Sequence, residues 1–123
     1  MKPLQSFAGI AYFLLRVVAG LLFACHGAQK LLGAFGGQQP PMGSLAWFAG
    51  VIELVGGVMI GAGIYTGAVA FLASGEMAVA YFRAHAPRGL FPIENGGELA
   101  ALYCFLFLYI ATRGGGKWSA TKP

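Results

Sequence analysis

The fold class is decided by residues 7–29, which read FAGIAYFLLRVVAGLLFACHGAQ and carry a single charged side chain, Arg16. A helix needs about 20 apolar residues to cross the roughly 30 Å of hydrocarbon in a bilayer, so this stretch is long enough to span it. Residues 44–64, SLAWFAGVIELVGGVMIGAGI, repeat the pattern around one charged residue, Glu53. Both stretches therefore predict transmembrane helices.

Two further helices complete the predicted bundle. Residues 66–84 follow the second span after a tight turn that contains glycine. Residues 95–112 are continuously apolar only from Leu99 onward, so a helix of spanning length has to begin near Asn95, with Glu98 beside the positive end of the helix dipole. The sequence thus predicts an all-α fold, a four-transmembrane-helix bundle that forms a single domain over residues 1–123.

Composition excludes several classes of protein. Hydrophobic residues make up 58% of the chain and charged residues 10%, against roughly 45–50% and 25% in an ordinary soluble domain. The lysines and arginines are scattered singly and form no basic stripe, so we expect no nucleic-acid partner. Cys25 and Cys104 lack the spacing of a disulfide framework or a metal site, and we expect small buried side chains there and no metal.

The two longest connections, residues 33–43 and 85–97, should emerge on the same side of the membrane, with both termini on the other. The side of the termini would carry Lys2, Arg113, Lys117 and Lys122, and the side of the long connections Lys30, Arg83 and Arg88. The slight excess of lysine and arginine on the side of the termini predicts a multi-pass protein of the bacterial inner membrane with both termini in the cytoplasm. Lys117, Trp118 and Lys122 look like an interfacial anchor.

Three charged residues fall inside the expected spans: Arg16, Glu53 and Glu76. Each would cost several kcal/mol if it faced lipid alone. Counting about 1.5 Å per residue from the expected helix ends places all three at a depth of about 13 to 16 Å, so we expect them to contact one another in a buried polar core. The contact could be a structural ion pair, or one glutamate could carry a proton for transport or redox coupling.

A second polar group is expected where the helices meet the long connections. Its members are His26, Gln29, Lys30, Arg83, His85, Glu94, Asn95 and Glu98. Such a rim could bind a small polar or quinone-like head group, although a single histidine in this position is more often structural. The sequence offers no haem ligands, dinucleotide loop or P-loop, and no catalytic residue is assigned.

An ordered series of motifs resembles the DoxX family of small bacterial membrane proteins. The series comprises Arg16, Gly20, His26-Gly27, Lys30-Leu31, Gly33, Phe35-Gly36-Gly37, Glu53-Leu54-Val55-Gly56-Gly57, Asn95-Gly96-Gly97-Glu98 and Gly114-Gly115-Gly116-Lys117-Trp118-Ser119. It spans nearly the whole chain. The C-terminus departs from the pattern, because family members often close with GPG and Ser-Leu-Asp where this chain has GGGKWSATKP.

The resemblance implies a four-helix membrane protein similar to the small subunit of an archaeal thiosulfate:quinone oxidoreductase. It transfers no catalytic residue and implies at most an accessory subunit of an oxidoreductase. The leading hypothesis is a redox-linked subunit that binds a quinone or small polar molecule at the outward-facing rim. The alternatives are a non-enzymatic membrane scaffold or assembly factor, and a small proton-linked transporter. The expected partners are lipid, a small-molecule ligand, and further copies of the chain or a partner oxidoreductase subunit.

Overall fold

The computed structural model describes residues 2–121, and these form helices and turns without any strand. The long helices are α2 (Ala8–Leu32), α3 (Leu45–Ala62), α4 (Thr66–Ala80) and α6 (Glu98–Arg113). Short helices are α1 (Lys2–Gln5) and α5 (Pro92–Asn95), with 3-10 turns at Ala34–Gly36 and Ala86–Arg88 and a π-helical segment at Tyr81–His85. The prediction of an all-helical fold is confirmed for these residues.

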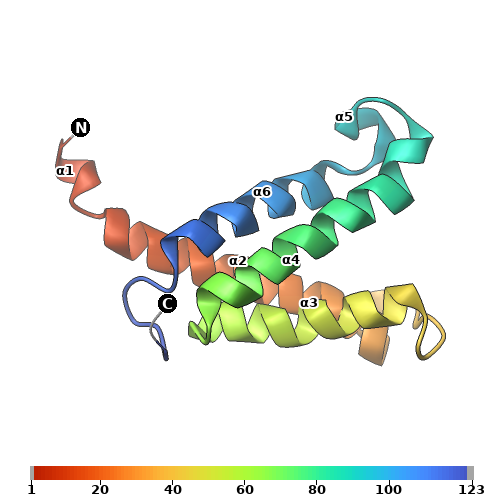
Figure 1. Ribbon diagram of the computed structural model, residues 1–123, viewed down its shortest axis with the longest axis horizontal. Helices are drawn as coiled ribbons and strands as arrows, with labels where there is room; N and C mark the ends of the chain where they lie inside the picture. Colours follow the sequence, from red (N-terminus) through yellow and green to blue (C-terminus); the bar gives the residue numbers. More distant parts are fainter. Residues whose placement is uncertain (1, 122–123) are drawn as a thin grey trace.

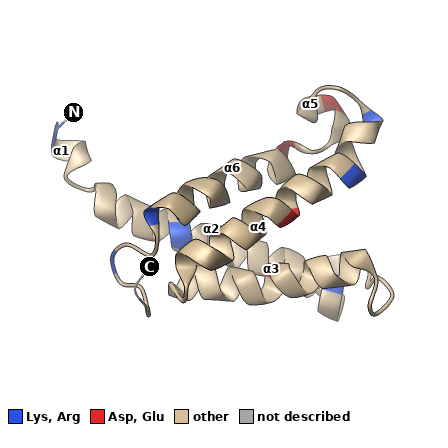
Figure 2. Cartoon of the chain, viewed as in Figure 1, with Lys and Arg blue, Asp and Glu red and all other residues tan. Residues whose placement is uncertain are grey.

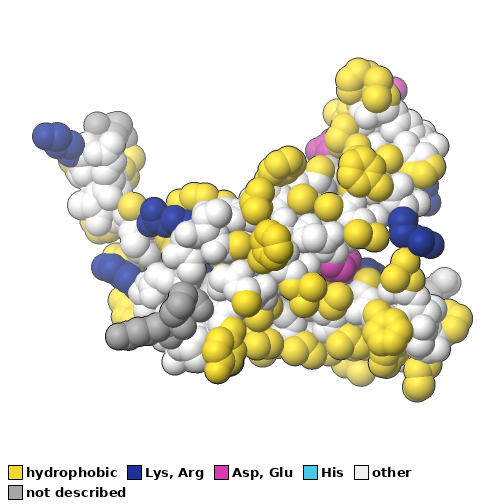
Figure 3. Space-filling view, viewed as in Figure 1, with side chains coloured by type: hydrophobic (Ala, Val, Ile, Leu, Met, Phe, Trp, Pro, Cys, Tyr) yellow, Lys and Arg dark blue, Asp and Glu magenta, His cyan; other side chains and the backbone are white. Residues whose placement is uncertain are grey.

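The four long helices form two pairs, α2 with α3 and α4 with α6 (Figure 1). The pairs lie close together where α2 begins and α6 ends, and they diverge toward the end that carries the two long connections. The space-filling view shows a notch between the pairs at this second end (Figure 3). The candidate site described below is lined by residues of both helix pairs.

Glycines set the distance between α2 and α3. A Cβ added to Gly20 would lie 2.5 Å from the backbone nitrogen of Gly61, and one added to Gly27 would collide with the backbone of Leu54. Gly57 is equally close to Ala24 on the opposing helix. Such contacts are typical of membrane helices, which associate through small residues that let the backbones approach.

Large apolar side chains cover the outside of the bundle. Leu21 is 62% exposed and Phe105 is 70% exposed, and Figure 3 shows apolar side chains along both helix pairs. Charged positions are few along the long helices (Figure 2). A surface of this kind suits contact with acyl chains, because hydrocarbon solvates apolar side chains without the free-energy cost that water imposes.

Two helices, α2 with 25 residues and α3 with 18, are long and apolar enough to cross a membrane. Helix α4 has 15 residues and continues directly into the five-residue π-helical segment. Helix α6 has 16 residues, or about 24 Å at 1.5 Å per residue. That α4 and α6 also cross the membrane stays a prediction.

The fourth long helix begins later than expected. The sequence suggested a start near Asn95, but Pro92–Asn95 form the separate helix α5, and Gly96 adopts a φ of 76° that breaks the helix. Helix α6 then starts at Glu98, which does lie in its first turn.

Candidate functional site

Arg16 is 1% exposed, but it binds neither Glu53 nor Glu76, so the expected contact among the three charges is wrong for this residue. Within residues 2–121, its guanidinium donates hydrogen bonds only to backbone carbonyls. The acceptors are Gly115 O, Lys117 O at 3.1 Å, Trp118 O at 3.2 Å and Gly61 O at 3.3 Å. A cage of carbonyl dipoles therefore replaces the carboxylate as the partner of this buried cation.

The carbonyl cage exists because the C-terminal segment folds back over α2. The Tyr12 hydroxyl donates to Gly114 O at 2.6 Å, and the rings of Phe13 and Trp118 pack edge to face at 4.8 Å. The backbone of this segment also pairs with the end of α3, where Ala120 N donates to Ala62 O at 3.1 Å. Lys117 and Trp118, expected as an interfacial anchor, thus have a packing role; Lys122, the third expected member, lies outside the described residues.

Lys30 is the residue that neutralises Glu53. Its Nζ lies 2.6 Å from Glu53 Oε2, and the Glu53 side chain is 1% exposed against 35% for Lys30. Arg16 cannot reach this pair, because it meets α3 at Gly61, eight residues beyond Glu53, a distance of about 12 Å along a helix. The estimate that Arg16 and Glu53 lie at the same depth failed because α2 and α3 are staggered. Counting residues from the end of each helix does not take this offset into account.

The carboxyl group of Glu76, on α4, is buried. Among residues 2–121, neither Glu76 oxygen has a hydrogen-bond donor, and the same holds for Glu53 Oε1. Lys30 thus takes the place beside Glu53 that was expected for Arg16, and the expected contact between the two glutamates stays a prediction.

The Lys30–Glu53 ion pair lines a cavity of about 400 Å³. The cavity is lined by Phe23, His26, Lys30, Glu53, Met77, Ala80, Ala84, His85, Gly96, Leu99, Ala100 and Tyr103, which come from both helix pairs. Its walls are mostly apolar and aromatic, with a few polar groups, as is usual for small-molecule sites.

The cavity includes only three of the eight residues expected at the rim: His26, Lys30 and His85. The side chains of Arg83, Glu94 and Glu98 are exposed and lie outside it. Gln29 instead donates to Phe35 O at 3.4 Å, within the connection that follows α2. The expected rim therefore does not form one site: three of its residues line the cavity, three are exposed, and the other two, Gln29 and Asn95, bond to the connections.

Asn95 is a structural residue. It is 2% exposed, donates to the Tyr81 hydroxyl at 3.0 Å and to Gly89 O at 3.1 Å, and accepts from Gly97 N at 2.8 Å. These bonds tie the connection between α4 and α6 to the π-helical segment. They also use both N–H donors of the side-chain amide.

Sequence reasoning missed Tyr103 as part of the site. This α6 residue is 4% exposed, and its ring stacks on Phe107 at 5.2 Å and meets His26 edge-on at 6.1 Å. Its position within an apolar helix could have indicated a role in the site, because the hydroxyl of a buried tyrosine usually needs a hydrogen-bond partner.

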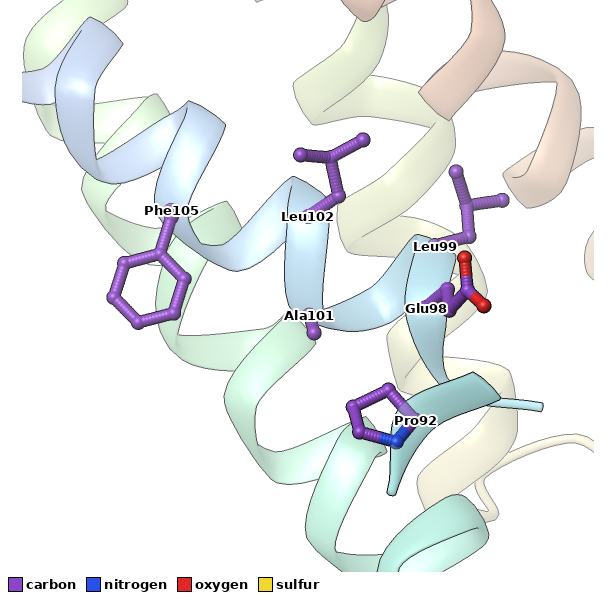
Figure 4. Close-up of a pocket in the computed structure, with 6 residues that line it drawn as sticks. All are labelled: Pro92, Glu98, Leu99, Ala101, Leu102 and Phe105. Carbon is purple, nitrogen blue, oxygen red and sulfur yellow. The ribbon is translucent and has the colours of Figure 1, made fainter. Parts of the chain in front are cut away.

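A second depression lies on the outer face of α6 (Figure 4). It has a volume of about 610 Å³ and is lined by Pro92, Glu98, Leu99, Ala101, Leu102 and Phe105. Glu98 is its one charged lining residue, and the rest of the wall is apolar. It lacks the convergent polar groups of the first cavity, which we therefore take as the candidate site.

The comparisons with known proteins agree with the motif series. The DoxX family model matches residues 11–86, a span that includes Arg16, Lys30, Glu53 and Glu76. An uncharacterized protein of Haemophilus influenzae is 45% identical over an alignment that covers 94% of this chain and 92% of that protein. No solved structure matches the chain. With more than half of its length matched by the family model, this chain belongs to the DoxX family.

Proposed function

We propose that this membrane protein binds a small molecule with a quinone-like or other polar head group in the cavity beside Lys30 and Glu53, as the ligand-binding subunit of a redox-linked complex. The observation that carries the proposal is the ion pair itself, since Glu53 is 1% exposed and lines the cavity with Lys30. Burying a charge pair in an apolar bundle is costly, and such residues within membrane segments usually mark functional sites.

The remaining walls suit a flat or partly apolar molecule. Phe23, Met77 and Tyr103 supply apolar and aromatic surface. His26 and His85 add ring nitrogens that can donate or accept hydrogen bonds. A volume of about 400 Å³ falls within the range of roughly 300 to 1,000 Å³ typical of ligand pockets.

The location of the cavity supports access from the side of the long connections. His85 and Gly96 line it and belong to the segment between α4 and α6. We place the termini in the cytoplasm and the long connections on the outer side of the bacterial inner membrane, so the cavity would open outward. A protease added to oriented inverted and right-side-out vesicles should then cut the 85–97 connection only from outside, and cleavage from inside would reverse the orientation.

The experiment that tests the function begins with mass spectrometry of small molecules retained through gentle purification. Titration with ubiquinone-1 in nanodiscs then compares the wild-type chain with Lys30→Gln and Arg83→Gln. Arg83 is a matched control, because it is a cation near the cavity whose side chain is exposed and does not line it. We expect Lys30→Gln to weaken binding at least tenfold and Arg83→Gln to leave it unchanged; equal effects of the two changes would refute the site.

One observation favours a second candidate, the proton-linked transporter. Carboxyl oxygens of both Glu53 and Glu76 are buried without a donor among residues 2–121, and Lys30 pairs with Glu53, an imbalance that permits exchange of a proton. Flux of protons in liposomes that disappears in Glu76→Gln, with normal folding, would support transport over a purely binding role.

A further inference from the structure

The end of the molecule that carries the termini has basic side chains and, within residues 2–121, no acidic ones. The four acidic residues of the chain lie elsewhere: Glu53 within α3, Glu76 within α4, Glu94 in α5 and Glu98 at the start of α6. Figure 2 shows lysine and arginine, but no aspartate or glutamate, near the two termini. No acidic side chain therefore neutralises the positive charge of this end.

Two exposed cations of this end, Arg113 and Lys117, lie along one face of α2. The Arg113 guanidinium lies over the Tyr12 ring at 5.6 Å and over the Tyr109 ring at 5.9 Å. Lys117 packs against Gly9, where an added Cβ would lie 3.5 Å from Lys117 Nζ. Positions 9 and 12 are three residues apart on α2, and side chains at this spacing are neighbours on a helix. The two cations therefore occupy neighbouring positions.

The fold fixes the backbone of both cations but leaves their charges unpaired. Arg113 is the last residue of α6, and Lys117 O accepts a hydrogen bond from buried Arg16 at 3.1 Å. Within residues 2–121 the Lys30–Glu53 pair is the only ion pair. Long basic side chains can pack along their methylene groups while the charged group stays outside. Both charged groups are thus held in place and remain available to an anion.

Aromatic side chains flank these cations at the surface. Trp118 is 64% exposed and Tyr109 is 49% exposed, and Lys117 Nζ lies 5.9 Å from the centre of the Trp118 ring. Tryptophan and tyrosine beside basic residues at a helix end are typical of the boundary between acyl chains and lipid headgroups. The exposed rings next to the cations therefore favour a lipid over a soluble anion.

We propose that Arg113 and Lys117 bind the phosphate group of an anionic phospholipid. A guanidinium donates paired hydrogen bonds to phosphate oxygens, and an ammonium group adds a point charge. Basic residues at a membrane surface attract anionic lipids. A zwitterionic headgroup also carries a phosphate, but its own ammonium group competes with the protein cations. The site therefore selects a headgroup with net negative charge.

The opposite end of the molecule differs in its charges. Arg83 and Arg88 are exposed there, but so are Glu94 and Glu98. A headgroup phosphate at that end meets carboxylates as well as cations, and like charges repel it. Arg83 and Arg88 therefore supply a matched control for the two cations of the proposed lipid site.

Native mass spectrometry of the full chain tests the selectivity. The chain in detergent is mixed with equal amounts of dioleoyl phosphatidylglycerol and dioleoyl phosphatidylcholine. Each basic residue at an anionic surface contributes a factor of about five in affinity. We expect the wild type to bind about tenfold more phosphatidylglycerol or better, and Arg113→Gln/Lys117→Gln to abolish that preference. Arg83→Gln/Arg88→Gln should keep it; no preference in the wild type, or equal losses in both double variants, would overturn the proposal.

Quenching of tryptophan fluorescence shows where the lipid binds. The chain has two tryptophans, Trp47 in the first turn of α3 and Trp118. In Trp47→Phe, a small fraction of brominated phosphatidylglycerol in phosphatidylcholine vesicles should quench Trp118 more than the same fraction of brominated phosphatidylcholine. In Trp118→Phe, the two brominated lipids should quench Trp47 equally. A difference at Trp47 and none at Trp118 would contradict the assigned position.

Glycerol 3-phosphate distinguishes a lipid from a free phosphate. Added at constant ionic strength, it should leave phosphatidylglycerol bound, because it lacks the acyl chains that contact the flanking rings. Displacement of the lipid would overturn the proposal in favour of a soluble phosphate. The lipid site is separate from the cavity beside Lys30, so ubiquinone-1 binding should be the same in Arg113→Gln/Lys117→Gln as in the wild type, and either proposal can fail alone.

Discussion

Replacing Arg16 by leucine tests how the bundle closes at the end that carries the termini. In the structure this side chain donates four hydrogen bonds to carbonyls, three of them in the C-terminal segment at Gly115, Lys117 and Trp118. We expect Arg16→Leu to release that segment and to leave the four long helices folded.

The magnitude follows from the kind of bonds that are lost. A hydrogen bond to a charged group contributes about 1.5 to 3 kcal/mol, but the four are not additive, because carbonyls of a released segment regain hydrogen bonds to water. Leucine also removes a buried cation, which offsets part of the loss. We therefore expect the docked state of the segment to lose about 2 to 3 kcal/mol, or about 30- to 140-fold in its population relative to the released state.

Limited trypsin digestion measures this population. We expect the peptide bond after Lys117 to be protected in the wild type, because its carbonyl accepts a bond from Arg16 at 3.1 Å. Cleavage there should accelerate by about the same factor in the variant when exchange between states is fast. Arg113→Leu is the control, because Arg113 is an exposed cation at the end of α6 that packs on Tyr12 and Tyr109. Cleavage after Lys117 that is no faster in Arg16→Leu than in this control would refute the carbonyl cage.

Three further changes test the packing and the Lys30–Glu53 ion pair. Gly27→Leu should abolish folding in detergent, because a side chain there would collide with the Leu54 backbone, whereas Gly75→Leu, which meets nothing within 4 Å, should fold. Asn95→Ala should cost about 2 to 3 kcal/mol through its three lost bonds, and hydrogen exchange should accelerate in the α4–α6 connection only. Lys30→Met should lower the free energy of unfolding at neutral pH by about 3 to 5 kcal/mol, because buried Glu53 loses its cation. Adding Glu53→Gln should recover much of that loss in thermal melts. Without such recovery, an unpaired buried Glu53 carboxylate would not be the cause of the loss.

The sequence determined the class of protein and the identity of the polar residues. Apolar runs of about 20 residues exclude a soluble surface whatever the packing, and the motif series led to the DoxX family, which the comparisons confirm. Burial of Arg16 and Glu53 followed from the cost of exposing charge to hydrocarbon. These conclusions depend on composition and on position along one helix, and a sequence states both directly.

The tertiary structure decided which charges meet. Close glycine contacts fix the stagger between α2 and α3, and that stagger places Glu53 beside Lys30 and Arg16 beside Gly61. The carbonyl cage around Arg16 depends on a chain reversal after α6, where Gly114 and Gly116 adopt φ values of 75° and 68°. Depth along a single helix carries no information about the offset between two helices, and a residue type does not reveal where a backbone carbonyl will point; both follow only from how the helices pack.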